Sequence, residues 1–336
     1  MSQIRIIKKN RAADLPDEWE EVTKGNIYLR KEFLDFIEHS EKDYAPVYYL
    51  FYEEERLDSV FVAHQRKEYN LGMFTKIDLK ITVTLIYLPM CVTAGSMVLG
   101  KLRDVVFDTI RSMRGYKMIL NLRETDVPGF ANGRTCPKCI LDLHFSSFDD
   151  YIGSLRSDYR NRAKKILRKT QSLQIRFIDN RSEFTDELYS LYLNVLNKSR
   201  VKIETLSKAY FTQKDFKVFV CYEDEKPVSF CQLLPDGDEL IFEFVGIDYE
   251  CNGAMPVYHR ILFEIIRYGI ENGFKTIDFG QTADDTKLKL GSHYVPLYAA
   301  LHSSNPFINF VCKLFAKKIE YKPLTTDFRV FKEGES

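Results

Sequence analysis

The sequence predicts a mixed α/β protein in which two similar domains follow one another, each with a mixed, mostly antiparallel sheet flanked by helices. Three observations carry this prediction. The chain has 336 residues. This length is too great for one domain with a single hydrophobic core and suits two domains of about 150 residues. The same order of elements, three strands, a helix and a fourth strand, occurs twice. Equivalent residues, such as Tyr52 and Tyr222 or Gly115 and Gly273, lie at a nearly constant separation.

Each copy opens with a predicted β-hairpin. In the first copy, residues 48–52 form an apolar strand, residues 53–56 a charged turn, and residues 59–63 the returning strand. Residues 217–233 repeat this pattern. Two apolar runs of strand length around a short charged turn are typical of a hairpin.

A third strand and an amphipathic helix follow each hairpin. The predicted third strands are residues 81–88 and 240–247. Apolar side chains then recur at helical spacing over residues 99–113 and 258–266. This spacing predicts helices with one buried face.

Both predicted helices end at a glycine, Gly115 or Gly273, and a further strand begins at once, at residues 116–122 and 274–280. Glycine commonly follows the last turn of a helix. A helical connection between two strands of one sheet requires them to run parallel. The sheet of each copy is therefore expected to combine antiparallel hairpins with one parallel pair.

Three stretches together resemble a known family. They are residues 26–34, an opening helix motif; residues 140–165, a strand followed by a basic helix; and residues 278–291, an Asp-Phe-Gly strand end followed by a lysine-glycine element. Their order and spacing are similar to the tandem form of the GNAT N-acyltransferase fold. This form is the FemAB-like group of acyltransferases and aminoacyltransferases.

The resemblance implies different roles for the two domains and a type of reaction. Residues 1–145 would form a first GNAT-like domain without chemistry, and residues 146–336 a second, catalytic one. The chain would transfer an acyl or aminoacyl group from acyl-CoA or aminoacyl-tRNA to a small-molecule or peptide-like amine, in a cleft between the domains. The alternative is a non-catalytic tandem GNAT-fold protein that serves as a binding or adaptor module.

The turn that would hold the pyrophosphate of acyl-CoA departs from the family pattern. Acetyl-CoA-dependent members present a Gln/Arg-x-x-Gly-x-Gly/Ala turn, whose amides bind the pyrophosphate at a helix N-terminus. The corresponding residues 249–256 lack this pattern, and the first copy offers only residues 93–96. Gly253 is the candidate phosphate-binding residue of the turn, and the identity of the donor stays open.

Four residues are candidates for the chemistry. By the resemblance, Lys287 occupies the family's lysine position and would polarise the acyl carbonyl. Glu243 lies in an apolar strand, where burial would raise its pKa and suit it to act as a base. Asp278 makes a similar case on the neighbouring strand, and Tyr298 is a candidate proton donor to the leaving group. The alternatives are a solvated lysine, carboxylates that are solvated or paired with lysine, and a tyrosine packed in the core.

A basic helix is predicted at the start of the second copy. Residues 156–169 carry seven basic side chains and one acidic side chain. Arg160, Arg162 and Lys165 are candidate ligands for phosphate groups of a tRNA, a nucleotide-linked sugar, a carrier or an anionic lipid. The alternative is a solvated basic face.

Other features limit the class of protein. Equal numbers of basic and acidic residues, 48 of each, argue against a dedicated nucleic-acid binder. Cys136 and Cys139 with His144 lack a second Cys-x-x-Cys pair, so no metal is expected. The absence of a secretory signal or a long apolar run predicts a cytoplasmic protein without a transmembrane segment. Residues 307–318 form an amphipathic basic helix, expected to cover the sheet rather than lie on a membrane, although peripheral membrane contact stays open.

Overall fold

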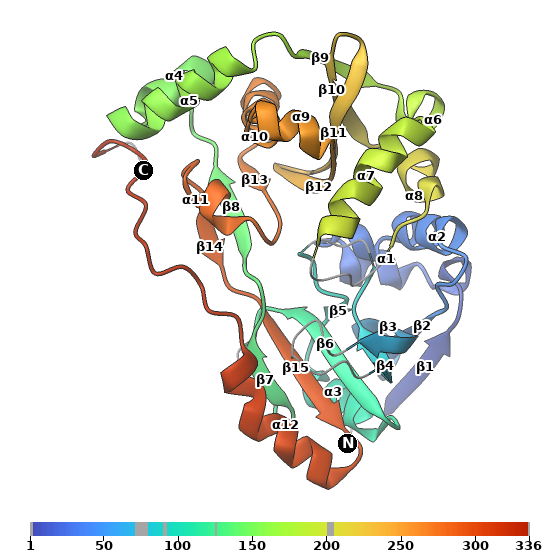
Figure 1. Cartoon of the computed structure of the whole chain (residues 1–336). Coiled ribbons are helices and arrows are strands. Elements are labelled where there is room, and N and C mark those ends of the chain that lie inside the picture. The colour runs from blue at the N-terminus through green and yellow to red at the C-terminus, as the bar shows by residue number, and fades with distance from the viewer. Residues whose placement is uncertain (1–2, 71–79, 90–92, 125, 200–204, 335–336) are drawn as a thin grey trace. The chain divides into compact units, whose positions relative to one another are not determined.

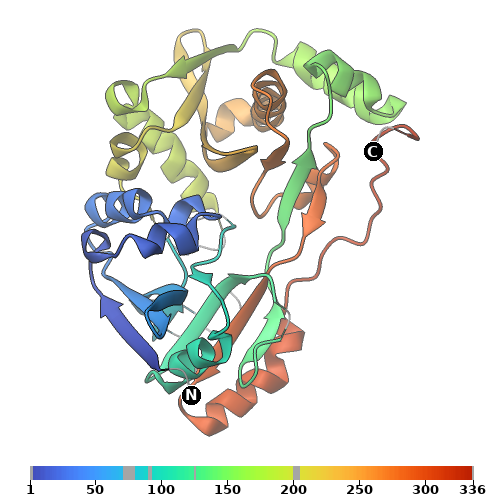
Figure 2. The ribbon, with the colours of Figure 1, turned by 180° about the vertical axis from the view of Figure 1, so that it is seen from behind.

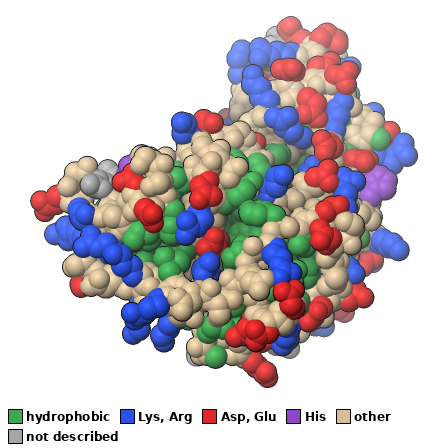
Figure 3. Space-filling model, turned by 90° about the horizontal axis from the view of Figure 1, so that it is seen from above, with side chains coloured by type: hydrophobic (Ala, Val, Ile, Leu, Met, Phe, Trp, Pro, Cys, Tyr) green, Lys and Arg blue, Asp and Glu red, His purple; other side chains and the backbone are tan. Residues whose placement is uncertain are grey.

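The computed structural model describes residues 3–70, 80–89, 93–124, 126–199 and 205–334 (Figures 1 and 2). The chain forms two compact units. Unit 1 comprises Met1–Cys136 and Pro296–Pro323, and unit 2 comprises Pro137–Val295 and Leu324–Ser336. On the face seen in Figure 3, basic and acidic side chains are interspersed, in keeping with the formal net charge of zero.

Unit 1 is built on an eight-stranded sheet with the order β1-β2-β3-β4-β6-β15-β7, in which β5 pairs with β3. Its strands are β1 (Ile4–Lys9), β2 (Pro46–Glu53), β3 (Arg56–Asn70), β4 (Lys80–Ile86), β5 (Met97–Val98), β6 (Tyr116–Leu122), β7 (Ala131–Arg134) and β15 (Tyr298–Ser303). Its helices are η1 (Ala12–Asp14), α1 (Glu18–Thr23), η2 (Ile27–Leu29), α2 (Lys31–Ser40), α3 (Arg103–Ser112) and α12 (Pro306–Ile319). Strands β4 and β6 pair in parallel, as the α3 crossover between them requires.

Unit 2 is built on a seven-stranded sheet with the order β14-β8-β13-β12-β11-β10-β9. Its strands are β8 (Lys138–Asp142), β9 (Gln174–Ile178), β10 (Lys217–Glu223), β11 (Lys226–Asp236), β12 (Glu239–Ile247), β13 (Thr276–Asp278) and β14 (His293–Val295). Its helices are α4 (Phe148–Ser154), α5 (Ser157–Lys169), α6 (Asn180–Glu183), α7 (Asp186–Lys198), α8 (Lys208–Gln213), α9 (Tyr249–Ala254), α10 (Val257–Glu271) and α11 (Asp284–Leu288). Here β12 and β13 form the parallel pair.

The predicted fold class and the predicted repeat are confirmed. The order β2-β3-β4-α3-β6 in unit 1 returns as β10-β11-β12-α10-β13 in unit 2. The apolar stripe of α10 packs into the core of unit 2, where Ile261, Leu262, Ile265 and Ile266 are fully buried. Burial of each such side chain stabilises the fold by about 1.5–3 kcal/mol.

The division of the chain differs from the expected boundary between residues 145 and 146. Strand β8 precedes that boundary, yet it pairs with β13 and β14 of unit 2. Strand β15 and helix α12 lie near the C-terminus, yet β15 pairs with β6 and β7 of unit 1. Each of these strands completes a sheet through hydrogen bonds to residues far away in sequence, which local apolar periodicity does not report.

Candidate active site

The sheet of unit 2 divides between its two parallel strands. Pairing of β12 with β13 is confined to Glu239–Ile241 against Thr276–Asp278. Beyond this point β12 continues along β11, whereas the chain after β13 follows β8. There, the Phe279 amide donates to the Cys139 carbonyl at 2.9 Å, and the Cys139 amide donates to the Gly280 carbonyl at 3.1 Å. The two strands therefore diverge in the middle of the sheet, next to Glu243 and Asp278.

Glu243 is the extra residue of a β-bulge. Leu233 of β11 pairs with Phe242, and Gln232 pairs with Phe244, so Glu243 has no opposite residue on β11. A bulge of this kind re-aims a side chain and is common beside active sites. The Glu243 side chain is 6% exposed, and its Oε2 accepts a hydrogen bond from the Tyr210 hydroxyl at 2.6 Å.

Glu243 and Asp278 lie on the same face of the sheet. Leu240 and Phe242 pack into the core beneath α10, so Ile241 between them points to the opposite face. Glu243, at the bulge, binds the Tyr210 hydroxyl, which lies outside that core. Asp278 pairs with Ile241 across the parallel ladder and shares its face. The structure thus brings the two predicted carboxylates to one side of the sheet, close to the point where it divides.

Asp278 is held by a buried ion pair. Its side chain is 1% exposed, its Oδ2 lies 3.1 Å from Lys138 Nζ, and its Oδ1 accepts from the Gly280 amide at 2.8 Å. Lys138 Nζ also lies 3.5 Å from Glu239 Oε1. Burial raises the pKa of Glu239, and Asp278 adds to this rise while Lys138 opposes it. Asp278 therefore compensates a buried lysine and fixes the turn that follows β13.

Lys287 is a buried cation rather than a solvated helix lysine. It is 2% exposed, and its Nζ donates to the Gln281 carbonyl at 2.7 Å. Thr282 and Ala283, between this carbonyl and α11, have φ angles of 64° and 52°. Left-handed backbone at a β-branched residue such as Thr282 costs about 1–3 kcal/mol and is typical of functional loops.

The pKa of the Cys139 thiol depends on three nearby charged side chains, one of which is Lys287. Burial raises the pKa of the thiol to about 11, Lys287 lowers it, and Asp284 and Asp278 raise it. These three charged side chains therefore lie within electrostatic reach of one thiol. The Asp284 carboxylate also accepts from the Tyr294 hydroxyl at 2.8 Å. Lys287 and Asp278, both predicted from the sequence, are thus both buried and both act on the Cys139 thiol.

Tyr298 lies on β15 in unit 1. It pairs with Leu122 of β6 and Arg134 of β7, and its half-buried ring packs against the core beneath α3. The other three catalytic candidates all lie in unit 2.

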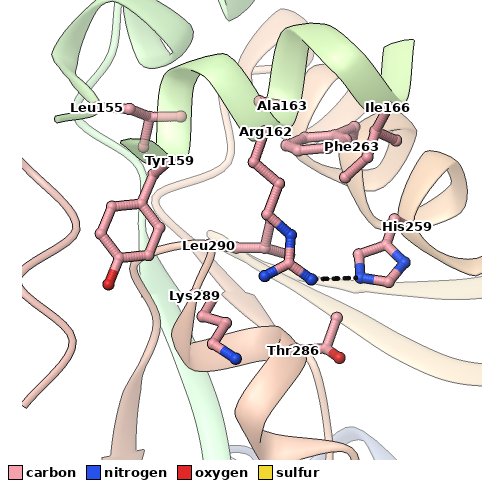
Figure 4. Close-up of a pocket in the computed structure, with 10 residues that line it drawn as sticks. All are labelled: Leu155, Tyr159, Arg162, Ala163, Ile166, His259, Phe263, Thr286, Lys289 and Leu290. Carbon is pink, nitrogen blue, oxygen red and sulfur yellow. Dashed lines mark hydrogen bonds between the residues drawn. The ribbon is translucent and has the colours of Figure 1, made fainter. Parts of the chain in front are cut away.

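Arg162 lines a pocket between α5, α10 and α11 (Figure 4). Polar groups from Arg162, His259, Thr286 and Lys289 line it beside an apolar surface formed by Leu155, Tyr159, Ala163, Ile166, Phe263 and Leu290. Arg162 Nη2 lies 3.3 Å from His259 Nε2, so the guanidinium donates and the ring nitrogen accepts. Burial, Arg162 and Lys289 lower the pKa of His259. The pocket therefore presents the Arg162 guanidinium beside the His259 imidazole, whereas Lys289 Nζ is paired with Asp285 Oδ2 at 2.6 Å.

The other two predicted ligands on α5 differ in their surroundings. Arg160 Nη1 donates to the carbonyls of Leu155 and Gly153 at 3.0 and 3.4 Å. Arg160 therefore satisfies carbonyls at the C-terminal end of α4, a structural role. Lys165 is exposed on α5.

Gly253 lies in a helix rather than in the predicted turn. It belongs to α9, which Asp248 caps through the amides of Glu250 and Cys251. Asn252 Oδ1 accepts from the Tyr258 amide in the first turn of α10 at 3.0 Å. A Cβ added at Gly253 would meet no atom within 4 Å, so no close approach requires glycine there. These residues do not fit the pyrophosphate turn of an acyl-CoA site.

Sequence reasoning missed three residues of this region. They are Tyr210, the hydroxyl partner of Glu243; Lys138, the ion-pair partner of Asp278; and Gln232. Gln232 is fully buried on β11, and its side-chain nitrogen and oxygen have no hydrogen-bond partner among the described residues. Gln232 could have been predicted as a site residue, because it is a polar residue within the apolar run 228–234. No sequence pattern marked Tyr210 or Lys138.

The described residues contain no group of three or more side chains suited to hold a metal ion. Cys136 lies in unit 1 and Cys139 in unit 2. Within the described part of the chain, no helix has the length and apolarity needed to cross a membrane.

Part of this chain matches a known protein family, and most of the chain is similar to several solved structures. Residues 153–288 match the family model described as acetyltransferase (GNAT) domain. No curated protein sequence matches the chain. The solved structure of L-PGS from Bacillus licheniformis is similar over 93% of this chain and 98% of that one, with 12% identity and a TM-score of 0.54. FemX is similar over 88% and 93%, with 10% identity and a TM-score of 0.48. A GCN5-related N-acetyltransferase from Anabaena variabilis is similar over 93% and 75%, with 9% identity and a TM-score of 0.44.

Residues 153–288 therefore match a GNAT acetyltransferase domain, and the chain shares the fold of L-PGS over most of its length. The matched residues lie in unit 2 and include most of its sheet, with Glu243, Asp278 and Lys287.

Proposed function

We propose that unit 2 transfers an acyl or aminoacyl group to an amine, with Glu243 as the group that removes the amine proton. The observation that carries this proposal is the position of Glu243. It lies on a β-bulge, is almost fully buried, and accepts a hydrogen bond from Tyr210 beside the point where β12 and β13 diverge. A buried carboxylate beside such a division of the sheet is a candidate general base.

The proposed reaction assigns a different task to each buried charge. The amine nitrogen attacks the acyl carbonyl carbon, a C–N bond forms, and the bond to the leaving sulfur or oxygen breaks. Glu243 takes the proton that the amine loses, and the leaving group gains a proton. Lys287 supplies positive charge for the oxyanion that develops on the carbonyl oxygen. Asp278 is assigned to positioning, because its two oxygens already bind Lys138 and the Gly280 amide.

We further propose that the pocket beneath α5 binds phosphate of the donor. Arg162 provides the cation, Lys289 lies beside it with its Nζ 2.6 Å from Asp285 Oδ2, and Lys165 on the same helix as Arg162 extends the basic surface. Phosphate is common to acyl-CoA and aminoacyl-tRNA. Because Asn252 already binds the Tyr258 amide, a CoA pyrophosphate would have to bind elsewhere than at the start of α10. For the acceptor amine, the sequence-based prediction of a cleft between the two domains is kept.

The test combines binding and transfer. Thermal unfolding of the chain is measured with acetyl-CoA, longer acyl-CoAs and charged tRNA, and label transfer from each stabilising donor to a panel of amines is followed by mass spectrometry. Arg162→Gln should remove the stabilisation by the donor.

Glu243→Gln should lower the transfer rate by about 10²–10⁴-fold, the usual contribution of a general base. Glu250→Gln, an exposed glutamate on α9, is the matched control and should retain the rate. Transfer at the normal rate by Glu243→Gln would contradict the role of Glu243. Failure of all three donors to bind would contradict the proposed reaction.

A further inference from the structure

Helix α12 of unit 1 exposes an apolar face. Among the described residues, eight large hydrophobic side chains are exposed, and four of them belong to this helix of 14 residues. They are Phe307 at 74%, Phe310 at 59%, Leu314 at 57% and Phe315 at 50%. Isolated exposed hydrophobic residues are ordinary, but a contiguous group marks an interaction surface.

The opposite face of α12 is already packed on the sheet of unit 1, against β7 and β15 (Figures 1 and 2). Asn309 Nδ2 donates to the Gly129 carbonyl at 3.2 Å, and Asn309 Oδ1 accepts from the Ser303 amide at 3.3 Å. Ala316 lies on this packed side, where its backbone approaches Gly133. The helix thus covers the sheet, as predicted, and the exposed aromatic residues are not needed for that packing.

Three lysines accompany the exposed apolar residues. At about 100° per residue, Phe307, Phe310 and Leu314 form one stripe, and the exposed Lys313, Lys317 and Lys318 lie along it. No acidic residue occurs within α12. The next acidic residue, Glu320, has Oε2 3.3 Å from the Arg134 amide, which donates to it. The exposed face is therefore both apolar and cationic.

We infer that α12 binds the surface of an anionic lipid bilayer. Aromatic and leucine side chains enter the boundary between headgroups and acyl chains, while lysines lie among the headgroups and attract anionic lipid. A second copy of the chain is a poorer partner, because a twofold contact through this face would bring six lysines together without a carboxylate from either helix.

The test is co-sedimentation of the full chain with vesicles of phosphatidylcholine alone or with about one third phosphatidylglycerol. The chain should bind the anionic vesicles, and binding should weaken as salt rises. The triple variant Phe307→Ala, Phe310→Ala, Leu314→Ala should bind about tenfold more weakly or worse. The triple variant Lys313→Gln, Lys317→Gln, Lys318→Gln should lose the preference for anionic lipid.

Ile4→Ala with Ile6→Ala is the matched control, because both isoleucines are exposed in unit 1 at 45% and 42%. It should bind vesicles like the unchanged chain. No binding to anionic vesicles at low salt would overturn the inference. A dimer in light scattering that the Phe and Leu changes dissociate would overturn it in favour of a second copy. Acyl transfer to a soluble amine without vesicles should be the same in all α12 variants, which separates this inference from the proposed reaction.

Discussion

Lys117 of unit 1 and Lys287 of unit 2 are both buried, and the two lysines differ in what surrounds them. In unit 1, Lys117 of β6 is fully buried, and its Nζ donates to the carbonyls of Met113 and Gly115 at 2.7 and 3.0 Å. In unit 2, Lys287 donates to the carbonyl of Gln281, next to two residues with left-handed backbone. Asp278 and Asp284 lie in the same neighbourhood.

The difference shows why burial of a charge does not by itself identify a site. The partners of Lys117 are carbonyls at the end of α3 and the turn into β6, so Lys117 closes the connection between those two elements. Burial lowers its pKa. Lys287 instead binds a carbonyl of a loop with left-handed backbone at Thr282 and Ala283, in the part of the chain that matches the GNAT family model. Partners and backbone strain separate a structural lysine from a candidate catalytic one.

The largest expected effect comes from removing the charge of Asp278 at the end of the parallel strand of unit 2. The position of unit 1 at the same separation from Gly115 as Asp278 has from Gly273 is occupied by Leu120, which is apolar. Asp278→Asn would leave Lys138 with only Glu239 at 3.5 Å. Loss of one partner of a buried ion pair should lower the free energy of unfolding by about 3–5 kcal/mol, as measured by urea denaturation.

The matched control is the double variant Asp278→Asn with Lys138→Met, which removes the unpaired charge and should recover most of the stability. Equal instability of the single and double variants would show that the ion pair is not the reason for the effect.

The next effect is the loss of stability at acid pH that results from burial of His64. Burial, helped by Arg66, lowers the pKa of His64 in unit 1 to about 4, whereas histidine in the unfolded chain takes up a proton near pH 6.5. The unfolded state therefore binds more protons between these values, and stability falls as the pH drops below 6.5. His64→Phe should remove about 2 kcal/mol of the loss between pH 7 and pH 5, measured by urea denaturation at each pH.

The unchanged chain, measured at the same pH values, is the reference for this experiment. An unaltered pH profile in His64→Phe would show that His64 does not remain neutral in the folded protein.

The smallest predicted effect tests the two lysines directly. Lys287→Met should lower the rate of acyl transfer by at least about tenfold, since the transition state loses a buried cation. Lys117→Met should keep the rate within about twofold, because its partners are backbone carbonyls of unit 1. The measurement is the single-turnover rate, with the melting temperature of each variant recorded. Similar losses of the transfer rate from both substitutions would contradict the distinction between a catalytic and a structural lysine.

Local patterns account for the elements that the sequence predicted correctly. The hairpin β10–β11, helix α10 and the return strand β13 follow from apolar runs, helical spacing and the glycine at residue 273. The presence of a carboxylate in the apolar strand β12 also marked Glu243 before its surroundings were known. Such signals are local because strand and helix periods act over neighbouring residues.

The sequence by itself thus determined the repeated order of elements, the parallel crossover in each copy, and the candidates Glu243, Asp278 and Lys287. Tertiary structure decided the rest. It assigned β8 to unit 2 and β15 with α12 to unit 1, formed the bulge that aims Glu243 at Tyr210, paired Asp278 with Lys138, and replaced the expected turn at Gly253 with a helix. These features depend on pairing and packing between residues far apart in the chain, and their free energy arises only when both partners are in place.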